Sequence, residues 1–241
     1  MKIGILQCDH VREALQPQFG DYHHMIAALF SKVAPDYQFK VFHIQLFEYP
    51  ENLDECDAYI TTGSRHSVYD DAAWIKHLEA FVIRLDQAKK PYVGICFGHQ
   101  IMIKALGGEV GKSDKGWGIG VSINQVTHQK PWMEPAQPTL NLIASHQDQV
   151  VTLPPHVNVD VLATSRFCPY YMLAYGDHFL SVQGHPEFSK DYSSTLIDTR
   201  RNIIPADRVR EGKASLTAAL DDQLFARWVV NFYNAEALNN R

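Results

Sequence analysis

The sequence lacks any apolar run that approaches the roughly 20 residues needed for a membrane-spanning helix. Its first apolar stretch, IGIL, is also too short for the core of a signal peptide. No stripe of basic residues is present, and the formal net charge of -5 argues against nucleic acid or an anionic membrane as the main partner. We therefore expect a protein with no membrane partner and no nucleic-acid partner.

Cysteine is scarce as well. The four cysteines lie far apart without a CxxC pair, and the sequence has no HExxH motif. This spacing fits neither a disulfide framework nor a zinc site, so we expect no metal site and a reducing, cytoplasmic location. Three of the cysteines are expected to pack in the core: Cys8, Cys56 and Cys168.

Two glycine patterns lack the setting of a nucleotide site. GGEVGKS, residues 107–113, has the wrong glycine spacing for a phosphate loop, and it follows a helical pattern instead of a strand. GWGIG comes before a strand pattern, whereas a dinucleotide site needs its glycines after one. Neither pattern predicts a nucleotide cofactor.

The N-terminal half of the chain has a regular alternation of strand and helix patterns. Strand patterns KIGILQC, FKVFHI, DAYITTGS and PYVGI alternate with helical patterns that begin after Asp21 and Asp71, and a further helix is predicted from Phe97 to Leu106. This order predicts an α/β fold with a mostly parallel central sheet and helices on both faces. Short strands between Gly118 and Val182 predict a smaller antiparallel region, and two helical stretches finish the chain.

No repeat, low-complexity segment or linker interrupts the 241 residues. The chain is long enough to bury a core of its own. We expect a single domain over residues 1–241.

A cysteine stands between two glycines at the boundary between the last of those strands and its helix. In PYVGICFGHQ, Cys96 lies between Gly94 and Gly98, which matches a nucleophile elbow with cysteine in the serine position. Small neighbours permit the tight turn, the helix N-terminus favours a thiolate, and the amide of Phe97 points at a developing oxyanion. We predict that Cys96 is a nucleophile, a packing cysteine being the alternative.

A thiol nucleophile needs a base, and the base needs an orienting group. Of the twelve histidines, His185 in SVQGHPEF is the best candidate, because it follows an apolar strand pattern. Glu187 lies two residues further on, which is the same side of an extended chain. The alternative is that HPE only begins a loop that caps the next helix; His146 in SHQDQV is a second candidate base that we expect to be structural.

The blocks GICFGHQ and GHPEF resemble the two signature blocks of class I glutamine amidotransferases. MKIGILQ, TTGS, LGGEV and SHQDQV also fall in that family's order, so the resemblance covers nearly the whole chain. It implies the flavodoxin-like fold of that family and a Cys-His-Glu triad. In this triad Cys96 would attack a γ-glutamyl carbonyl, His185 would shuttle the proton, and Glu187 would orient His185.

The resemblance implies further site residues. Gly63 would be the second oxyanion donor beside the amide of Phe97, and Gln100 would hold the glutamyl portion of the substrate. Backbone contacts to that portion are implied for three residues of SHQDQV: Ser145, Gln147 and Asp148. The reaction would pass through a cysteinyl thioester, release glutamate with ammonia or an amine, and need no metal or organic cofactor.

Two departures from the amidotransferase pattern bear on function. Gly63 and Ser64 stand where amidotransferases often have two glycines, and TTGSRHSVYDDAAWI more closely resembles the γ-glutamyl peptidases, which act on glutathione-like compounds. No synthase domain accompanies the domain, so we expect any acceptor of ammonia to be a separate synthase subunit, as for an amidotransferase domain of the GMP synthase type.

Three functions therefore stay open. The first is an amidotransferase-type hydrolase that cleaves a small γ-glutamyl substrate and serves a synthase subunit, and the second is a stand-alone γ-glutamyl peptidase. The third is a non-catalytic regulatory or binding module on the same fold, against which the complete triad argues. A related group of cysteine peptidases and chaperones shares the elbow cysteine but lacks a late HPE block.

Neither the motifs nor the resemblance assigns a function to one charged segment. Residues 198–213, DTRRNIIPADRVREGK, are expected to form a solvated face, with a lid or a subunit contact as the alternative.

Overall fold

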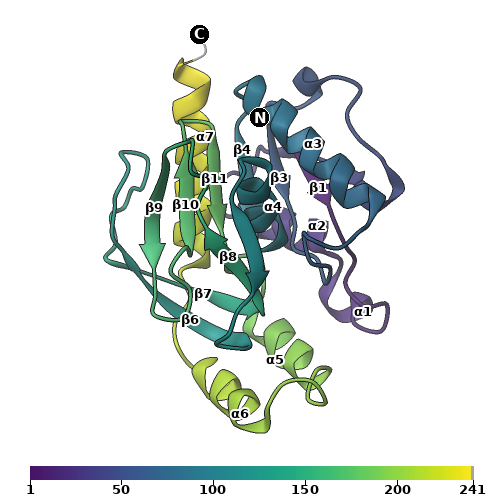
Figure 1. Cartoon of the computed structure of the whole chain (residues 1–241), viewed down its shortest axis with the longest axis vertical. Coiled ribbons are helices and arrows are strands. Elements are labelled where there is room, and N and C mark those ends of the chain that lie inside the picture. The colour runs from purple at the N-terminus through teal and green to yellow at the C-terminus, as the bar shows by residue number, and fades with distance from the viewer. Residues whose placement is uncertain (240–241) are drawn as a thin grey trace.

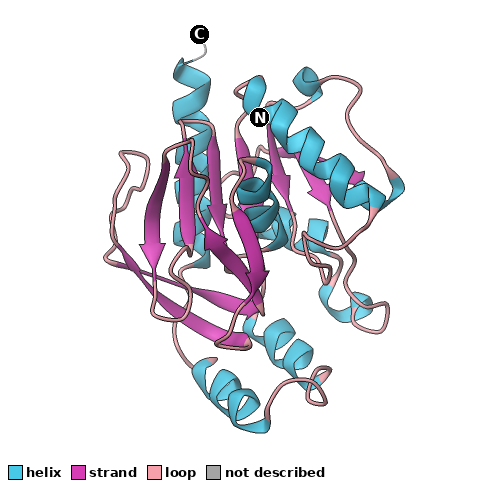
Figure 2. Cartoon of the chain, in the orientation of Figure 1, coloured by secondary structure: helices cyan, strands magenta, loops and turns pink. Residues whose placement is uncertain are grey.

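The parallel half of a nine-stranded sheet forms the centre of the molecule (Figures 1 and 2). The computed structural model describes residues 1–239 of the chain, so residues 240–241 of the expected single domain lie outside the described part. Five strands run parallel in the spatial order β2 (Gln38–His43), β1 (Lys2–Gln7), β3 (Ala58–Thr61), β4 (Tyr92–Ile95) and β11 (Phe179–Val182). This part of the structure confirms the predicted α/β fold.

The antiparallel strands extend the same sheet beyond β11. They follow in the order β10 (Met172–Tyr175), β9 (Val159–Thr164), β6 (Gly118–Val126) and β7 (Thr139–His146). A separate two-stranded sheet pairs β5 (Glu109–Lys112) with β8 (Asp148–Thr152). The smaller antiparallel region is therefore largely a continuation of the central sheet.

Helices cover both faces of the sheet (Figure 1). The helices α2 (Tyr22–Ser31) and α7 (Asp222–Asn239) pack on one face, and α3 (Ala73–Gln87) and α4 (Phe97–Ala105) pack on the other. The parallel strands are buried along almost their whole length because both of their faces are covered. The short α1 (Gln16–Phe19) lies before α2, and two 3₁₀ turns follow β2, at Ile44–Leu46 and Leu53–Glu55.

The chain ends with three helices and not with the two that were expected. The helices α5 (Lys190–Asp198) and α6 (Ala206–Ser215) pack near β6, before α7. Leu216 caps α6 and Leu220 precedes α7, so the fourfold leucine spacing does not mark one helix. Asp221 is instead tied to β7, where its amide donates to the carbonyl of Asn141 and its carboxylate accepts the amide of Asn141, both at 2.8 Å, and α7 begins after it.

Within residues 1–239 no helix is long and apolar enough to cross a bilayer.

The turn between β4 and α4 is a single residue, Cys96. Its φ of 52° and ψ of -96° lie in a sparsely populated region, which costs a non-glycine residue about 1–3 kcal/mol. The flanking glycines make the turn possible because the backbone is crowded on both sides. A Cβ on Gly94 would overlap the carbonyl oxygen of Gly98, and a Cβ on Gly98 would lie 2.8 Å from the carbonyl oxygen of Thr61.

We predict that Gly94→Ala destabilises the protein by about 1–3 kcal/mol, because the new methyl group overlaps backbone that cannot give way. Denaturant unfolding measures this change. Gly111→Ala is the matched control, since the nearest atom to its Cβ is Val151 Cγ2 at 3.4 Å, an ordinary contact. Equal unfolding midpoints for the two variants would contradict the prediction.

Candidate active site

Three of the predicted site residues come together at the carboxyl ends of β4 and β11. Cys96 follows β4, and its amide donates to Val182 on β11 at 2.9 Å. His185 follows β11, and its Nδ1 lies 2.8 Å from Glu187 Oε1. All three side chains are buried. The ends of two neighbouring parallel strands thus bring together residues that lie far apart in the sequence.

The backbone and ring of His185 are both fixed. Its amide donates to Ile143 on β7 at 2.7 Å, and its ring stacks on Phe188 with centroids 4.0 Å apart. Because Nδ1 is hydrogen-bonded to Glu187, Nε2 is the ring nitrogen that remains available to Cys96. Among the described residues Nε2 has no hydrogen-bond partner that meets normal geometry.

The charges around His185 favour its protonated form. Burial lowers the pKa of the imidazole, but the negative charges of Cys96 and Glu187 and the hydrogen bond to Glu187 outweigh it and raise the pKa to about 10. This value lies above the roughly 6.5 of an unperturbed histidine. Protonation of His185 therefore stabilises the fold fully below about pH 6.5, and that contribution is lost as the pH rises toward 10.

Gly63 and Phe97 both lie next to Cys96, Gly63 after β3 and Phe97 at the start of α4. Phe97 is the first residue of α4, so its amide has no acceptor inside the helix. Within residues 1–239 neither this amide nor that of Gly63 donates a hydrogen bond. A Cβ on Gly63 would lie 2.8 Å from His185 Cε1 and 3.7 Å from Cys96 Cβ. Glycine is needed here because the histidine ring occupies the space of a side chain.

An ion pair between the buried Asp9 and the exposed Arg65 holds the turn that contains Gly63. Asp9, which follows β1, accepts the Nε and one Nη atom of Arg65 at 2.8 and 2.7 Å, and the amide of Arg65 at 2.8 Å. Burial raises the pKa of the Asp9 carboxyl, but these hydrogen bonds outweigh it and lower the pKa below its ordinary value. The Thr62 hydroxyl donates to the carbonyl of Gly63 at 3.0 Å and accepts the amide of Cys8 at 2.9 Å.

Gln100 belongs to a chain of amides beside the sulfur. Its Nε2 donates to the carbonyl of Asp148 at 2.9 Å and to Gln183 Oε1 at 3.1 Å. Gln183 Nε2 in turn donates to Cys96 Sγ at 3.5 Å. The side-chain nitrogen of Gln100 therefore makes its hydrogen bonds within the protein. No donor among residues 1–239 is hydrogen-bonded to Gln100 Oε1.

The carboxylate of Asp148 is hydrogen-bonded to other side chains of the protein. It accepts the hydroxyl of Ser67 at 2.5 Å and that of Tyr69 at 3.0 Å, both from the loop after β3. Asp148 therefore ties this loop to the start of β8. Its side chain is fully used in that contact, which leaves its backbone as the part able to meet a ligand.

Ser145, Gln147 and Asp148 line a cavity of about 380 Å³ that opens onto Cys96 and Gln100. Pockets of about this size and larger hold small molecules. The end of β7 and the start of β8 form one wall, and the loop after β3 forms another. The structure thus brings all of the predicted substrate residues to one cavity.

Arg200 also lines this cavity, as an exception within residues 198–213, most of which are exposed as expected of a solvated face. Its guanidinium donates to Ser145 Oγ at 2.9 Å and lies 5.7 Å from the ring centroid of Trp117. Burial lowers the pKa of this guanidinium. The turn after α5 directs the side chain inward, and a charged sequence pattern does not show such an inward turn.

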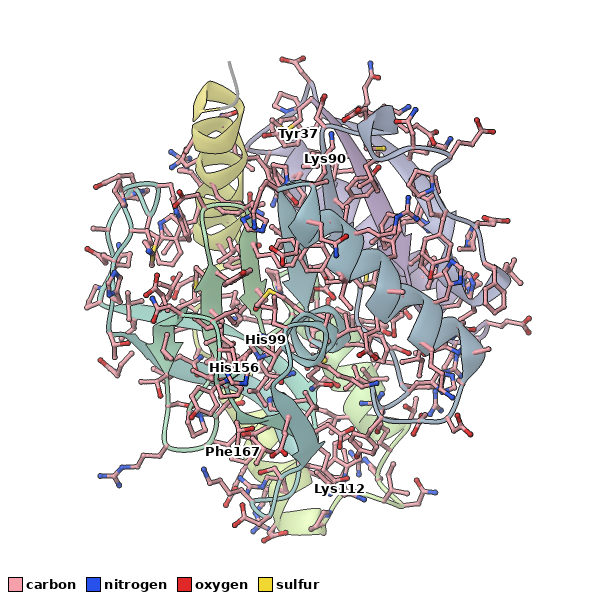
Figure 3. All side chains as sticks on the ribbon, turned by 45° about the horizontal axis from the view of Figure 1, so that its top comes forward. Tyr37, Lys90, His99, Lys112, His156 and Phe167 are labelled. Atoms are coloured by element: carbon pink, nitrogen blue, oxygen red, sulfur yellow. The ribbon has the colours of Figure 1, made fainter. Side chains whose placement is uncertain are left out.

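His146 is buried and is held by the backbone, although it also borders the cavity. Its Nδ1 lies 3.1 Å from the carbonyl of Asp148, and burial lowers its pKa to about 4. His99 is bonded to Ser181 at 2.8 Å, and burial lowers its pKa to about 3. Figure 3 labels His99 near the middle of the molecule, on α4. Both rings are neutral at physiological pH, so His185 is the histidine of this site with a raised pKa.

Sequence reasoning missed Gln183 and Arg200. Gln183 lies two residues before His185, so the period of a strand could have placed it on the same side. No comparable signal marks Arg200, because its position depends on how α5 ends. Within residues 1–239 no three His, Cys, Asp or Glu side chains are grouped so that they could hold a metal ion.

Comparison with known proteins agrees with this fold. The family model for glutamine amidotransferase class-I matches residues 19–198, which is most of the chain. A solved glutamine amidotransferase from Thermotoga maritima superposes with a TM-score of 0.74 at 17% identity, with 97% of each chain covered. An α/β fold with an elbow cysteine defines the class of protein. The chain belongs to the class I glutamine amidotransferase family.

Curated relatives extend the comparison. The chain is 30% identical to gamma-glutamyl peptidase 3 of Arabidopsis thaliana over 229 residues, which is 90% of this chain and 89% of that protein. It is 28% identical over 179 residues to a glutamine-hydrolyzing GMP synthase subunit of Ignicoccus hospitalis, covering 74% and 89% of the two chains. These relatives support an enzyme with the character of a glutamine amidotransferase-like hydrolase.

We predict that Glu187→Gln lowers the pKa of His185, because the substitution removes one of the two negative charges that raise it. NMR titration of the imidazole nitrogens measures this pKa. Asp86→Asn is the control, since Asp86 accepts a hydrogen bond from His178 and not from His185. An unchanged His185 pKa in Glu187→Gln would show that the carboxylate does not act on the ring.

We also predict that Gly63→Ala reduces turnover much more than it reduces stability. The methyl group would displace the His185 ring, and loss of catalytic geometry costs about 10²-fold or more in rate. Measuring kcat beside the unfolding midpoint separates the two effects. A Gly63→Ala variant with the kcat of the wild type would show that turnover does not depend on the present position of the His185 ring.

Proposed function

We propose that the protein cleaves γ-glutamyl amides through a cysteinyl thioester on Cys96. The observation that carries this proposal is the arrangement at the elbow. A buried cysteine lies near two backbone amides that donate no hydrogen bond, those of Gly63 and Phe97, and a histidine held by a buried glutamate stands beside it. The membership in the glutamine amidotransferase family supports the choice of a γ-glutamyl bond.

The first half of the reaction follows from these positions. Cys96 Sγ attacks the γ-carbonyl carbon, with protonated His185 as the counter-ion of the thiolate. The oxyanion that forms lies between the amides of Gly63 and Phe97, and one such donor is worth about 3 kcal/mol of transition-state stabilisation. His185 then gives its proton to the leaving nitrogen, and ammonia or an amine departs from the γ-glutamyl thioester.

The second half frees the enzyme. Neutral His185 takes a proton from water, which attacks the thioester carbon, and the same two amides hold the second oxyanion. Collapse breaks the carbon–sulfur bond and releases glutamate. Glu187 keeps the ring in place through both halves, and Gln183 supports the sulfur with its amide. No step needs a metal or an organic cofactor.

The proposal also covers the cellular compartment of the reaction and the part of the chain that forms the site. All four cysteines are free, and a thiolate nucleophile must stay reduced, so we place the enzyme in a reducing compartment such as the cytoplasm. One domain supplies every part of the site, from β1 to α5.

Two modes of action fit the site. The 30% identity to a gamma-glutamyl peptidase over nearly all of both chains favours a stand-alone γ-glutamyl hydrolase. The likeness to a GMP synthase subunit favours instead a protein that hands ammonia to a synthase partner. We place the stand-alone hydrolase first, because its relative covers more of the chain at higher identity.

Cys96→Ala is expected to lower kcat/KM for glutamate release from γ-glutamyl compounds by about 10⁴-fold or more, as removal of a nucleophile does elsewhere. The assay uses purified protein with glutamine and with γ-glutamyl peptides as substrates. Cys56→Ala is the control, since Cys56 is buried next to β3 and does not line the cavity.

The outcomes of this assay distinguish the three candidate functions. Rapid unaided release of glutamate from a γ-glutamyl peptide supports the stand-alone hydrolase. Slow turnover of glutamine alone favours the synthase partner. The wild type and Cys96→Ala could instead be equally inactive toward every substrate, and a glutamine-analogue electrophile could fail to label Cys96. This result would refute the enzyme proposal and favour the non-catalytic module.

A further inference from the structure

The cavity over Cys96 is lined by an excess of positive charge. Its cationic side chains come from four separate parts of the chain: Arg12, Arg65, Lys112 and Arg200. The one carboxylate in the lining is Asp148, and it is turned toward Ser67 and Tyr69. A chain with a formal net charge of -5 thus gathers cations at this single cavity.

Only one of these cations has a carboxylate partner. Arg65 is paired with the buried Asp9. Within residues 1–239 no carboxylate lies within 4.0 Å of the charged nitrogens of Arg12, Lys112 or Arg200. Arg12 and Lys112 are exposed at the rim, and Figure 3 labels Lys112 at the end of β5. Arg200 is the half-buried member.

Arg200 is held in place although no carboxylate among the described residues neutralises it. One guanidinium nitrogen is bonded to Ser145 Oγ, and the group lies over the ring of Trp117. Placing an unpaired cation where it is partly desolvated is unfavourable unless an anion completes the site. A guanidinium also has the planar geometry that binds a carboxylate through two hydrogen bonds.

The γ-glutamyl group brings no net negative charge to the cavity. At neutral pH it carries one ammonium and one carboxylate, which cancel. Free glutamine is therefore neutral overall, and its leaving group is neutral ammonia. A cavity with several unpaired cations and one engaged carboxylate instead suits a substrate with a net negative charge, because its field concentrates such molecules.

We propose that Arg200 is a specificity residue that binds a carboxylate on the amine side of the bond to be cleaved. The preferred substrate is then a γ-glutamyl amino acid or peptide with a free carboxylate, and free glutamine is a poor one. Arg12 and Lys112 attract the anion from the rim, and Arg200 holds it. This inference rests on the proposed γ-glutamyl hydrolysis and adds to it the chemistry of the leaving group.

The test compares γ-glutamylglycine with γ-glutamylglycinamide, which differ only in the charge of the leaving group. We expect the wild type to prefer the acid by about tenfold or more in kcat/KM, the effect of one hydrogen bond to a charged group. This preference should shrink as salt is added. Arg200→Gln should lower kcat/KM for the acid by about 10- to 100-fold and leave the amide nearly unchanged.

Arg201→Gln is the matched control, because Arg201 is exposed and paired with Asp198, outside the cavity. It should keep the preference of the wild type. An equal loss on both substrates in Arg200→Gln would overturn the inference and place Arg200 on the glutamyl portion or in the fold. A full rate on both would overturn it as well.

A binding measurement separates this inference from the proposed reaction. Calorimetry with Cys96→Ala protein, which cannot form the thioester, gives the affinity for both uncleaved compounds. Tighter binding of the acid, lost on adding Arg200→Gln, supports the carboxylate site even if the wild type cleaves neither compound. Cleavage of both compounds at equal rates and with equal affinities refutes the carboxylate site and leaves γ-glutamyl hydrolysis standing.

Discussion

The close approach of α4 to the ends of β3 and β4 is the constraint on which the site depends. The backbones of Gly94, Gly98 and Thr61 nearly touch, so no side chain fits between them. This contact forces Cys96 into an unfavourable backbone conformation and leaves the amide of Phe97 without an acceptor. The strain is spread over the packed core that surrounds the turn. The sulfur of Cys96 and the amide of Phe97 are thereby fixed by the same few backbone atoms.

A network of polar contacts, most of them buried, and one ring stack keep the rest of the site in register with that turn. Asp9 and Arg65 hold the Gly63 side, and Glu187 and Phe188 hold the His185 side. Gln183 and Gln100 connect the sulfur to β8, where the loop after β3 is also fastened. Buried polar groups are favourable only when they are well satisfied, so such a network also makes one arrangement of the site much preferred. Rigid positions for the reacting groups follow from it.

Much of the fold could be predicted from the sequence, because the signals are local. Buried strand patterns in the N-terminal half alternate with strong helical patterns, and Asp21 caps α2 as its position suggested. The elbow could also be predicted, because a cysteine between two glycines at the start of a helix has few other uses. The expectation of two final helices was wrong, because Leu216 and Leu220 continue the helical spacing across a break that Asp221 makes.

Other parts of the site depend on tertiary contacts that no short pattern shows. The sequence predicts only backbone contacts to the substrate for Asp148, and no pattern shows that its carboxylate accepts hydrogen bonds from Ser67 and Tyr69, which lie about 80 residues earlier in the chain. Arg200 looks like part of a solvated face, yet it points into the cavity because α5 ends beside Ser145. The sign of the His185 pKa shift likewise depends on the balance between burial and two nearby charges. Each of these is settled by packing between distant segments.

The central claim is that Cys96 carries the γ-glutamyl group during turnover. Acid quenching of the wild type during reaction with a γ-glutamyl peptide, followed by mass spectrometry of the digested protein, tests it directly. The account predicts that the peptide containing Cys96 gains the mass of one γ-glutamyl group, and that hydroxylamine removes it. Glutamate release without any such adduct, or an adduct on another residue, would contradict the account.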